Sequence, residues 1–134
     1  MPLEGEQLSI KEALALCNVV GFAPNQLDVA VAVMCAESGR YTKAWHANLA
    51  ADGLTILSTD RGIYQVNDKA HPDFTVEDAF DPKKNAAFTY RLSKQGTDWS
   101  PWMAYNSGAH EKFLDAVKEV RTSTEWRTRK KLWD

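Results

Sequence analysis

The chain has 134 residues, of which 44% are hydrophobic and 25% charged, and its formal net charge is −2. This length is sufficient for one buried core but not for two, so we expect a single domain over residues 1–134. The ordinary composition excludes a disordered chain, the lack of a long apolar run argues against a membrane span, and the near balance of charge argues against a dedicated nucleic-acid binder.

Two helices are predicted at the start of the chain. Ser9 and Glu12 have the spacing of a capping box, and apolar residues then recur at helical spacing until Gly21. Asn25 is the expected N-cap of the second helix, which Gly39 should end in the left-handed conformation.

The two cysteines of the chain, Cys17 and Cys35, lie within these helices among apolar residues. Two cysteines are too few for a disulfide framework, and a buried free cysteine packs like a small hydrophobic residue. We therefore expect two buried free thiols rather than one bridge.

The middle of the chain carries the β signal. Residues 40–57 are mixed in pattern, which predicts a loop or an irregular strand that leads to a turn. From 58 to 67 the sequence STDRGIYQVN alternates around Gly62, which predicts a short strand or one arm of a hairpin.

Short helices are predicted in the second half. Thr75 and Asp78 have the spacing to cap a short turn of helix. Asp81 and Pro82 supply an N-cap followed by proline at the first helical position, and this helix should run to about Gln95.

Residues 100–101 repeat this pattern and predict a helix that ends near Gly108, and an amphipathic stripe predicts a last helix over about 110–121. The basic run 121–133 is expected to be a solvated helix face or a frayed end rather than an anion-binding site. These helices and the hairpin predict an α+β fold that is mostly α.

Glu37 is a candidate catalytic acid. It shares the apolar face of the second helix with Met34 and Leu27, and it lies near the negative end of the helix dipole. Both effects raise the pKa of a carboxyl group, and an acid that keeps its proton at neutral pH can donate it to a leaving group. The alternative is that Glu37 rotates into solvent at a frayed helix end.

Asp60 is a candidate partner of different character. Its neighbours Ser58, Thr59 and Arg61 form a polar setting that favours a charged carboxylate. Cleavage of a glycosidic bond commonly uses one protonated and one ionised carboxyl group. Taken alone, an aspartate before Arg-Gly is more often a turn residue.

Three sequence blocks in order resemble the lysozyme superfamily: AESG (36–39), STDRGIYQVN (58–67) and AYNSG (104–108). The second block is similar to the hairpin of animal-type lysozymes, and the third is similar to an element of soluble lytic transglycosylases and goose-type lysozymes. The stretch from about 25 to 120 resembles the lysozyme-like domains of actinobacterial phage lysins and tail proteins.

The resemblance implies a lysozyme-like helical domain with a small β-hairpin beside the active-site cleft. It implies that Glu37 is the catalytic acid and that Asp60 is a nucleophile or a stabiliser of positive charge. Two departures leave the need for Asp60 open: the gap between the acids is longer than in animal-type lysozymes, and lytic transglycosylases usually use a single glutamate.

The predicted substrate-binding residues come from two arguments. The resemblance implies that Gln65, Asn67, Tyr105 and Asn106 line the sugar cleft. Aromatic rings stack on sugars, and from the aromatic residues we expect Tyr64, Trp45 and Tyr105 to do so. The three histidines are expected at surface or turn positions rather than in catalysis: His46, His71 and His110.

The implied function is that of a muramidase, which cleaves the β-1,4 bond between N-acetylmuramic acid and N-acetylglucosamine in peptidoglycan. The alternatives are a lytic transglycosylase that gives 1,6-anhydro products and a non-catalytic peptidoglycan-binding module. We expect no cofactor and no metal, a monomer, and glycan strands rather than nucleic acid or a membrane as the partner. Residues 1–10 lack the pattern of a signal peptide, so we expect a phage virion or the host cytoplasm as the location, or a domain excised from a larger protein.

Overall fold

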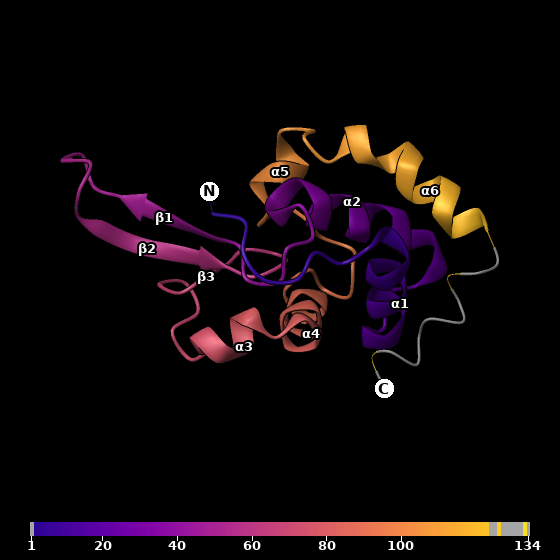
Figure 1. Cartoon of the computed structure of the whole chain (residues 1–134), viewed down its shortest axis with the longest axis horizontal. Helices are drawn as coiled ribbons and strands as arrows, with labels where there is room; N and C mark the ends of the chain where they lie inside the picture. The colour runs from indigo at the N-terminus through magenta and orange to yellow at the C-terminus, as the bar shows by residue number, and fades with distance from the viewer. Residues whose placement is uncertain (1, 124–125, 127–132, 134) are drawn as a thin grey trace.

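The computed structural model describes residues 2–123, 126 and 133. Figure 1 shows helices gathered into one body, from which a hairpin of two strands projects at one end. Most of the basic run 121–133 lies outside the described residues, so the prediction for it is not addressed by the structure.

The first helix, α1 (Ile10–Val20), begins and ends as predicted. The Ser9 hydroxyl accepts the backbone N–H of Glu12, and the Glu12 carboxylate accepts the N–H of Ser9, both at 3.0 Å. Gly21 ends the helix with a φ of 122°, and its N–H bonds to carbonyl groups of the last turn.

The second helix, α2 (Leu27–Ser38), ends at Gly39 with a φ of 62°, which confirms the predicted stop. Its start differs from the prediction, because Asn25 lies inside a 3-10 turn, η1 (Pro24–Gln26), and does not cap the helix. Proline at the first position favours this turn, and the Gln26 side chain closes its start by accepting the N–H of Ala23 at 2.9 Å.

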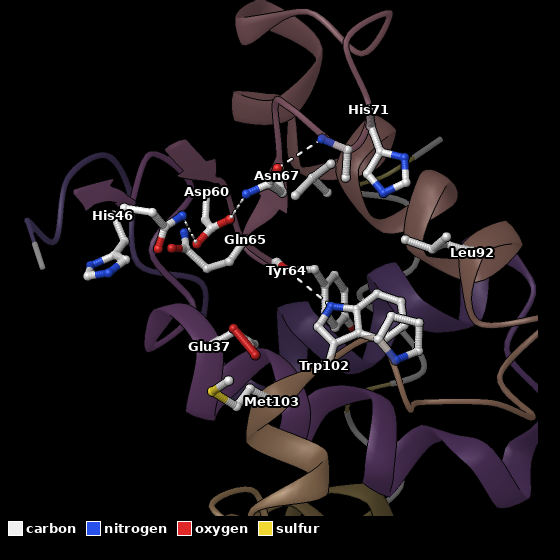
Figure 2. A pocket seen from close by; sticks show the side chains of 14 residues that line it. Glu37, His46, Asp60, Tyr64, Gln65, Asn67, His71, Leu92, Trp102 and Met103 are labelled. Atoms are coloured by element: carbon white, nitrogen blue, oxygen red, sulfur yellow. Dashed lines mark hydrogen bonds between the residues drawn. The ribbon is translucent and has the colours of Figure 1, made fainter. Parts of the chain in front are cut away.

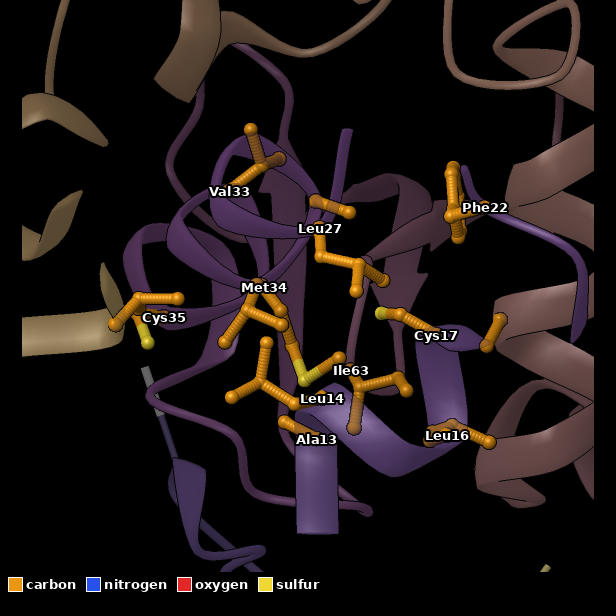
Figure 3. Close-up of a cluster of buried hydrophobic side chains, with 14 of the residues drawn as sticks. Ala13, Leu14, Leu16, Cys17, Phe22, Leu27, Val33, Met34, Cys35 and Ile63 are labelled. Atoms are coloured by element: carbon orange, nitrogen blue, oxygen red, sulfur yellow. The ribbon is translucent and has the colours of Figure 1, made fainter. Parts of the chain in front are cut away.

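α2 is the central helix of the core. It is apolar on nearly all sides, which is typical of a helix surrounded by other elements, and it contacts α1, α5 and α6. Figure 3 shows side chains of α1 and α2 meeting Ile63 from the segment after the hairpin. Large side chains with almost no exposed surface include Leu14, Leu16, Leu27, Val31, Val33, Met34 and Ile63.

Cys17 and Cys35 are both buried and free, which confirms the prediction for them. The Cys17 sulfur lies 3.3 Å from the hydroxyl oxygen of Tyr64, which in turn donates to the carbonyl of Ala30 at 2.7 Å. Burial raises the pKa of the Cys17 thiol to about 12. The thiol is therefore a packing group that stays protonated at neutral pH.

The sheet has three antiparallel strands in the order β1 (Trp45–Leu49), β2 (Ile56–Arg61) and β3 (Val66–Asn67). β2 and β3 confirm β structure in the segment 58–67, although a turn at 62–65 divides it into two strands. β1 confirms the irregular strand predicted within 40–57, since its register shifts between Asn48 and Leu49 before the turn. Asp60 pairs with His46 on one side and with Asn67 on the other. Paired residues share a face of the sheet, so these three side chains lie on one side of it.

The base of the hairpin is tied to the helical body through Asn85. This residue is fully buried, and its amide donates to the carbonyls of Ala79 at 2.8 Å and Arg61 at 3.2 Å. Its side-chain oxygen accepts the N–H of Tyr64 at 3.1 Å. Gly62, with a φ of 83°, makes this approach possible, because a Cβ there would overlap the Ala79 carbonyl and the Asn85 amide.

α3 (Val76–Phe80) starts at the predicted Thr75 capping box, and α4 (Pro82–Leu92) starts at the predicted Asp81 cap. α4 stops three residues earlier than predicted, because Lys94, Gln95 and Gly96 all have positive φ values of 52°, 62° and 83°. The Ser93 hydroxyl accepts the N–H of Gly96 at 2.9 Å and closes this turn.

The last elements are shorter than the pattern predicts. α5 (Met103–Asn106) begins two residues after Pro101, because Trp102 remains extended with φ −101° and ψ 118°. The predicted final helix is divided into a 3-10 turn, η2 (Glu111–Phe113), and α6 (Leu114–Thr122).

Candidate active site

A pocket of about 560 Å³ lies between the sheet and the ends of three helices. One wall is polar and comes from the paired strands, with His46, Asn48, Asp60 and Asn67. The opposite wall is largely apolar and comes from the end of α4 and the start of α5: Leu92, Pro101, Trp102 and Met103. Figure 2 shows Glu37 at the end of α2, facing the space between these walls.

Glu37 lines this pocket and is half-buried, so it is not the freely solvated residue of the alternative interpretation. Its pKa is raised from 4.5 to about 7, first because burial disfavours the charged form and also because the charge of Asp60 repels a second negative charge. A hydrogen bond from the Ala104 backbone opposes this rise. The carboxyl group is therefore poised to hold a proton near neutral pH.

Ser38 fixes the end of α2 that carries Glu37. It has no exposed surface, and its hydroxyl donates to the carbonyl of Ile63 at 2.8 Å. The same oxygen accepts the N–H of Arg40 at 3.1 Å. This contact joins the helix end to the segment that follows the hairpin.

Asp60 is held by two asparagine side chains. The Asn48 amide donates to one carboxylate oxygen at 3.1 Å, and the Asn67 amide donates to the other at 2.8 Å. Both amides also reach the Ser58 hydroxyl, at 3.0 and 3.1 Å. Two N–H donors suit an ionised carboxylate, which only accepts hydrogen bonds. The neighbouring Arg61 pairs with Asp68 instead, at 3.1 Å.

Asn67 also shapes the loop that follows β3. Its side-chain oxygen accepts the N–H groups of Lys69 at 3.0 Å and Ala70 at 2.9 Å, and its backbone carbonyl accepts the N–H of His71 at 3.1 Å. One residue thus positions Asp60 and carries His71 to the far end of the pocket (Figure 2).

The prediction that the Tyr64 ring stacks on a sugar is wrong. Tyr64 borders the pocket but has no exposed surface, and its ring packs between Cys17, Trp99 and Trp102. The backbone carbonyl of Tyr64 instead accepts the indole N–H of Trp102 at 3.1 Å. Its hydrophobic ring is a core element that supports the pocket floor.

The structure does not support the prediction for Trp45 either. Side chains alternate along β1, so Trp45 lies on the opposite face from His46 and Asn48, which line the pocket. The Trp45 indole approaches Glu4 at 3.4 Å.

Gln65 and Asn67 line the pocket as predicted. The Gln65 backbone has a positive φ of 53°, and its amide donates to the carbonyls of Ala44 at 3.0 Å and Gly62 at 2.9 Å. Through these bonds, the side-chain amide of Gln65 stabilises the turn at 62–65. Its contact with a sugar stays a prediction.

Tyr105 and Asn106 lie on α5 and are not among the residues that line the pocket. The Tyr105 ring is 39% exposed and stacks on His110 at 4.8 Å. The Asn106 amide donates to the Ser100 carbonyl at 2.7 Å. Substrate binding by these two residues stays a prediction.

Several pocket residues were not predicted. His46 and His71 line the pocket. His110 lies outside it, in a turn as predicted, but is buried beside the Ala104 carbonyl. Asn48 lies two residues after His46 on β1, so both side chains face the pocket, but this spacing has meaning only once the strand is known. Met103 has no such signal, although its side chain borders the pocket and is 80% exposed.

The raised pKa of Glu37 predicts a pH-dependent gain in stability for Glu37→Gln. Below the ordinary value of 4.5 the carboxyl group is protonated in both folded and unfolded chains, whereas above about 7 the folded chain must bury a charge. The wild type therefore loses stability as pH rises through this window, by about 1–3 kcal/mol after allowance for partial exposure. Urea unfolding of both proteins should show Glu37→Gln to be more stable at about pH 8 and not at about pH 4. The same difference at both pH values would contradict the burial of an ionisable group.

Among the residues that the structure describes, no three metal-ligating side chains gather into a possible metal site. Within the same residues, no helix has the length and apolar character needed to cross a membrane.

A model of the lysozyme-like domain family matches residues 14–104, which include Glu37, Asp60 and the whole sheet. Searches of curated proteins and of solved structures found no match. The chain therefore belongs to the lysozyme-like domain family, whose members are generally glycosidases or transglycosylases that act on peptidoglycan.

Proposed function

We propose that this protein is a muramidase that hydrolyses the β-1,4 bond between N-acetylmuramic acid and N-acetylglucosamine. One observation carries the proposal: Glu37, with its pKa raised to about 7, lines the same pocket as Asp60 and senses its charge. The two carboxyl groups thus differ in environment in the sense that glycoside cleavage requires.

In the proposed reaction, protonated Glu37 donates its proton to the bridging oxygen as the bond to the sugar carbon breaks. Positive charge then develops on the sugar ring, and the Asp60 carboxylate stabilises it or bonds to it. Water adds to the same carbon and returns its proton to Glu37. The products are two glycan ends, one of them reducing.

A lytic transglycosylase is the second candidate. The hydrogen bonds that Asp60 makes support it. Each Asp60 oxygen already accepts one asparagine amide, which suits a fixed charge better than an attacking nucleophile. The acetamido oxygen of muramic acid would then bond to the sugar carbon as the glycosidic bond breaks. The C6 hydroxyl would next displace that oxygen from the carbon and give its proton to Glu37, which leaves a 1,6-anhydro sugar. A non-catalytic binding module has no comparable support, because binding alone does not require a proton-donating acid.

The product ends discriminate between these candidates. Purified cell wall would be digested with the wild type and with Asp60→Asn, and the released sugars examined by mass spectrometry. Reducing ends, lost in Asp60→Asn, would support the muramidase. Anhydro ends that persist in Asp60→Asn would identify a transglycosylase. If the folded wild type released no sugar, the non-catalytic binding module would be the remaining candidate.

Asn48 should be a positioning residue for Asp60. Asn48→Ala removes one of the two amides that orient the carboxylate, and we expect kcat to fall about tenfold with a smaller change in KM. Asn18→Ala is the matched control, because Asn18 is exposed on α1 and lies outside the pocket. Equal effects of the two substitutions on kcat would contradict this role.

We also propose that the enzyme serves a bacteriophage as a lysin or as a virion-associated lysozyme. The support is the resemblance of residues 25–120 to phage lysin and tail domains. Immunodetection of the protein in purified virions, or only in infected cells before lysis, would separate the two settings.

A further inference from the structure

A second groove of about 350 Å³ lies beside the active-site pocket, between α3 and α4. The groove is lined by Phe74, Asp78, Lys84, Ala87 and Arg91. Figure 1 shows that α3 and α4 are neighbours below the base of the hairpin, on the same side as the loop that carries His71.

Phe88 joins the groove to the active-site pocket. Its ring meets the His71 ring edge-on at 4.9 Å and stacks on Phe74 at 4.4 Å, and the Arg91 guanidinium carbon lies 5.8 Å from its centre. His71 belongs to the pocket, whereas Phe74 and Arg91 belong to the groove. Phe88 is half-exposed, so an aromatic surface runs from the active-site pocket to the groove.

The helical repeat of α4 explains this continuity. Lys84, Phe88 and Arg91 follow one another at spacings of four and three, which places them on one face of the helix. Leu92 is one turn beyond Phe88 and lines the active-site pocket. A single face of α4 therefore contributes to both depressions.

The two depressions differ in charge. The active-site pocket holds Glu37 and Asp60, and no lysine or arginine is among its lining residues. In the groove, Lys84 is paired with Asp78 at 3.3 Å, whereas Arg91 is exposed and has no carboxylate partner in the described part of the chain. An anionic group attached to a bound sugar would thus be repelled from the pocket and attracted to Arg91.

We propose that this groove binds the acidic stem peptide that branches from muramic acid, while the glycan occupies the active-site pocket. This inference rests on the proposed function, because peptidoglycan is the substrate whose sugars carry short peptides with free carboxylates. The peptide leaves the pocket past His71, crosses the Phe88 ring and places a carboxylate at Arg91. Arginine suits this contact because its planar guanidinium binds a carboxylate through two parallel hydrogen bonds.

Calorimetric titration of Glu37→Gln, which should bind without cleaving, tests the proposal. The ligands are soluble four-sugar fragments of peptidoglycan with tetrapeptide stems, and the same fragments after an amidase has removed the stems. The fragment with stems should bind the more tightly. Arg91→Gln, made in the same background, should weaken its binding about tenfold and leave binding of the stripped fragment unchanged.

Two further variants make the result specific. Arg91→Lys keeps the charge and should restore part of the lost affinity. Lys112→Gln is the matched control, because Lys112 also lies over an aromatic ring, at 5.2 Å from the centre of Phe113, but outside both depressions. It should bind both fragments as the parent does.

Equal affinity for the two fragments, or an equal effect of Arg91→Gln on both, would overturn the stem-peptide site. Failure of the proposed function is distinguishable from this result. It would appear as intact sugar chains after digestion with the wild type, whereas the preference for stems is a binding measurement on a variant that does not turn over.

Discussion

Replacing Glu37 by glutamine should lower the rate of cell-wall cleavage by about 10²–10⁴-fold, the contribution typical of a general acid. Glutamine keeps the size of the side chain, but its amide protons are not acidic enough to be given to the leaving oxygen. Because the charge that burial penalises is also removed, the variant should be at least as stable as the wild type at neutral pH. Loss of activity would then not arise from loss of fold. The measurement is release of sugar ends from purified wall, with circular dichroism as the test of folding.

Glu119→Gln is the control for this substitution. Glu119 is exposed on α6 and lies outside the pocket, so its replacement makes the same chemical change away from the site. It should cleave at the wild-type rate. Equal rates for the wild type and Glu37→Gln would remove the acid role from Glu37.

Gly62→Ala should lower the free energy of unfolding by at least about 3 kcal/mol. The position has a φ of 83°, which disfavours any residue with a Cβ, and the added methyl group would overlap the Ala79 carbonyl and the Asn85 amide. Neither atom can move freely, because Asn85 is buried and bonded to three backbone groups. Urea unfolding of the variant would give the free-energy difference.

Gly53→Ala separates the two costs of this substitution. Gly53 also has a positive φ, of 72°, but a Cβ there would meet no atom within 4 Å. Its replacement should cost only about 1 kcal/mol, which is the backbone term. If the two variants were equally stable, the close approach at Gly62 would carry no energetic weight.

The helices could be predicted wherever the chain carries its own start and stop signals. The Ser9 capping box, the Asp81–Pro82 pair and Gly39 act through bonds to residues a few positions away, so the sequence contains the whole interaction. The bounds and pairing of β1 could not be predicted, because its partner is β2 and short mixed strands have little local pattern. The start of α2 was not predicted either, because a 3-10 turn that begins at Pro24 includes Asn25, the expected N-cap.

The candidate site was predictable in its chemistry but not in its shape. Glu37 stands out because a carboxylate on an apolar helix face is locally unusual, whereas Asp60 became a candidate through the resemblance of the block STDRGIYQVN. Tyr64 and Trp45 were misassigned, since an aromatic residue gives no sign of whether it faces the core or the solvent. The clamp of Asn48 and Asn67 on Asp60 depends on strand register, which only the folded hairpin supplies.

The buried thiol of Cys17 allows local unfolding of the helical core to be measured by its chemical modification. Its sulfur is sealed between α1, α2 and Tyr64, so an alkylating reagent can react only when these elements separate. The rate at which Cys17 is alkylated would therefore report how often these elements separate, without a probe introduced by mutation. Since neither cysteine is cross-linked, reductants leave the covalent structure of the protein unchanged.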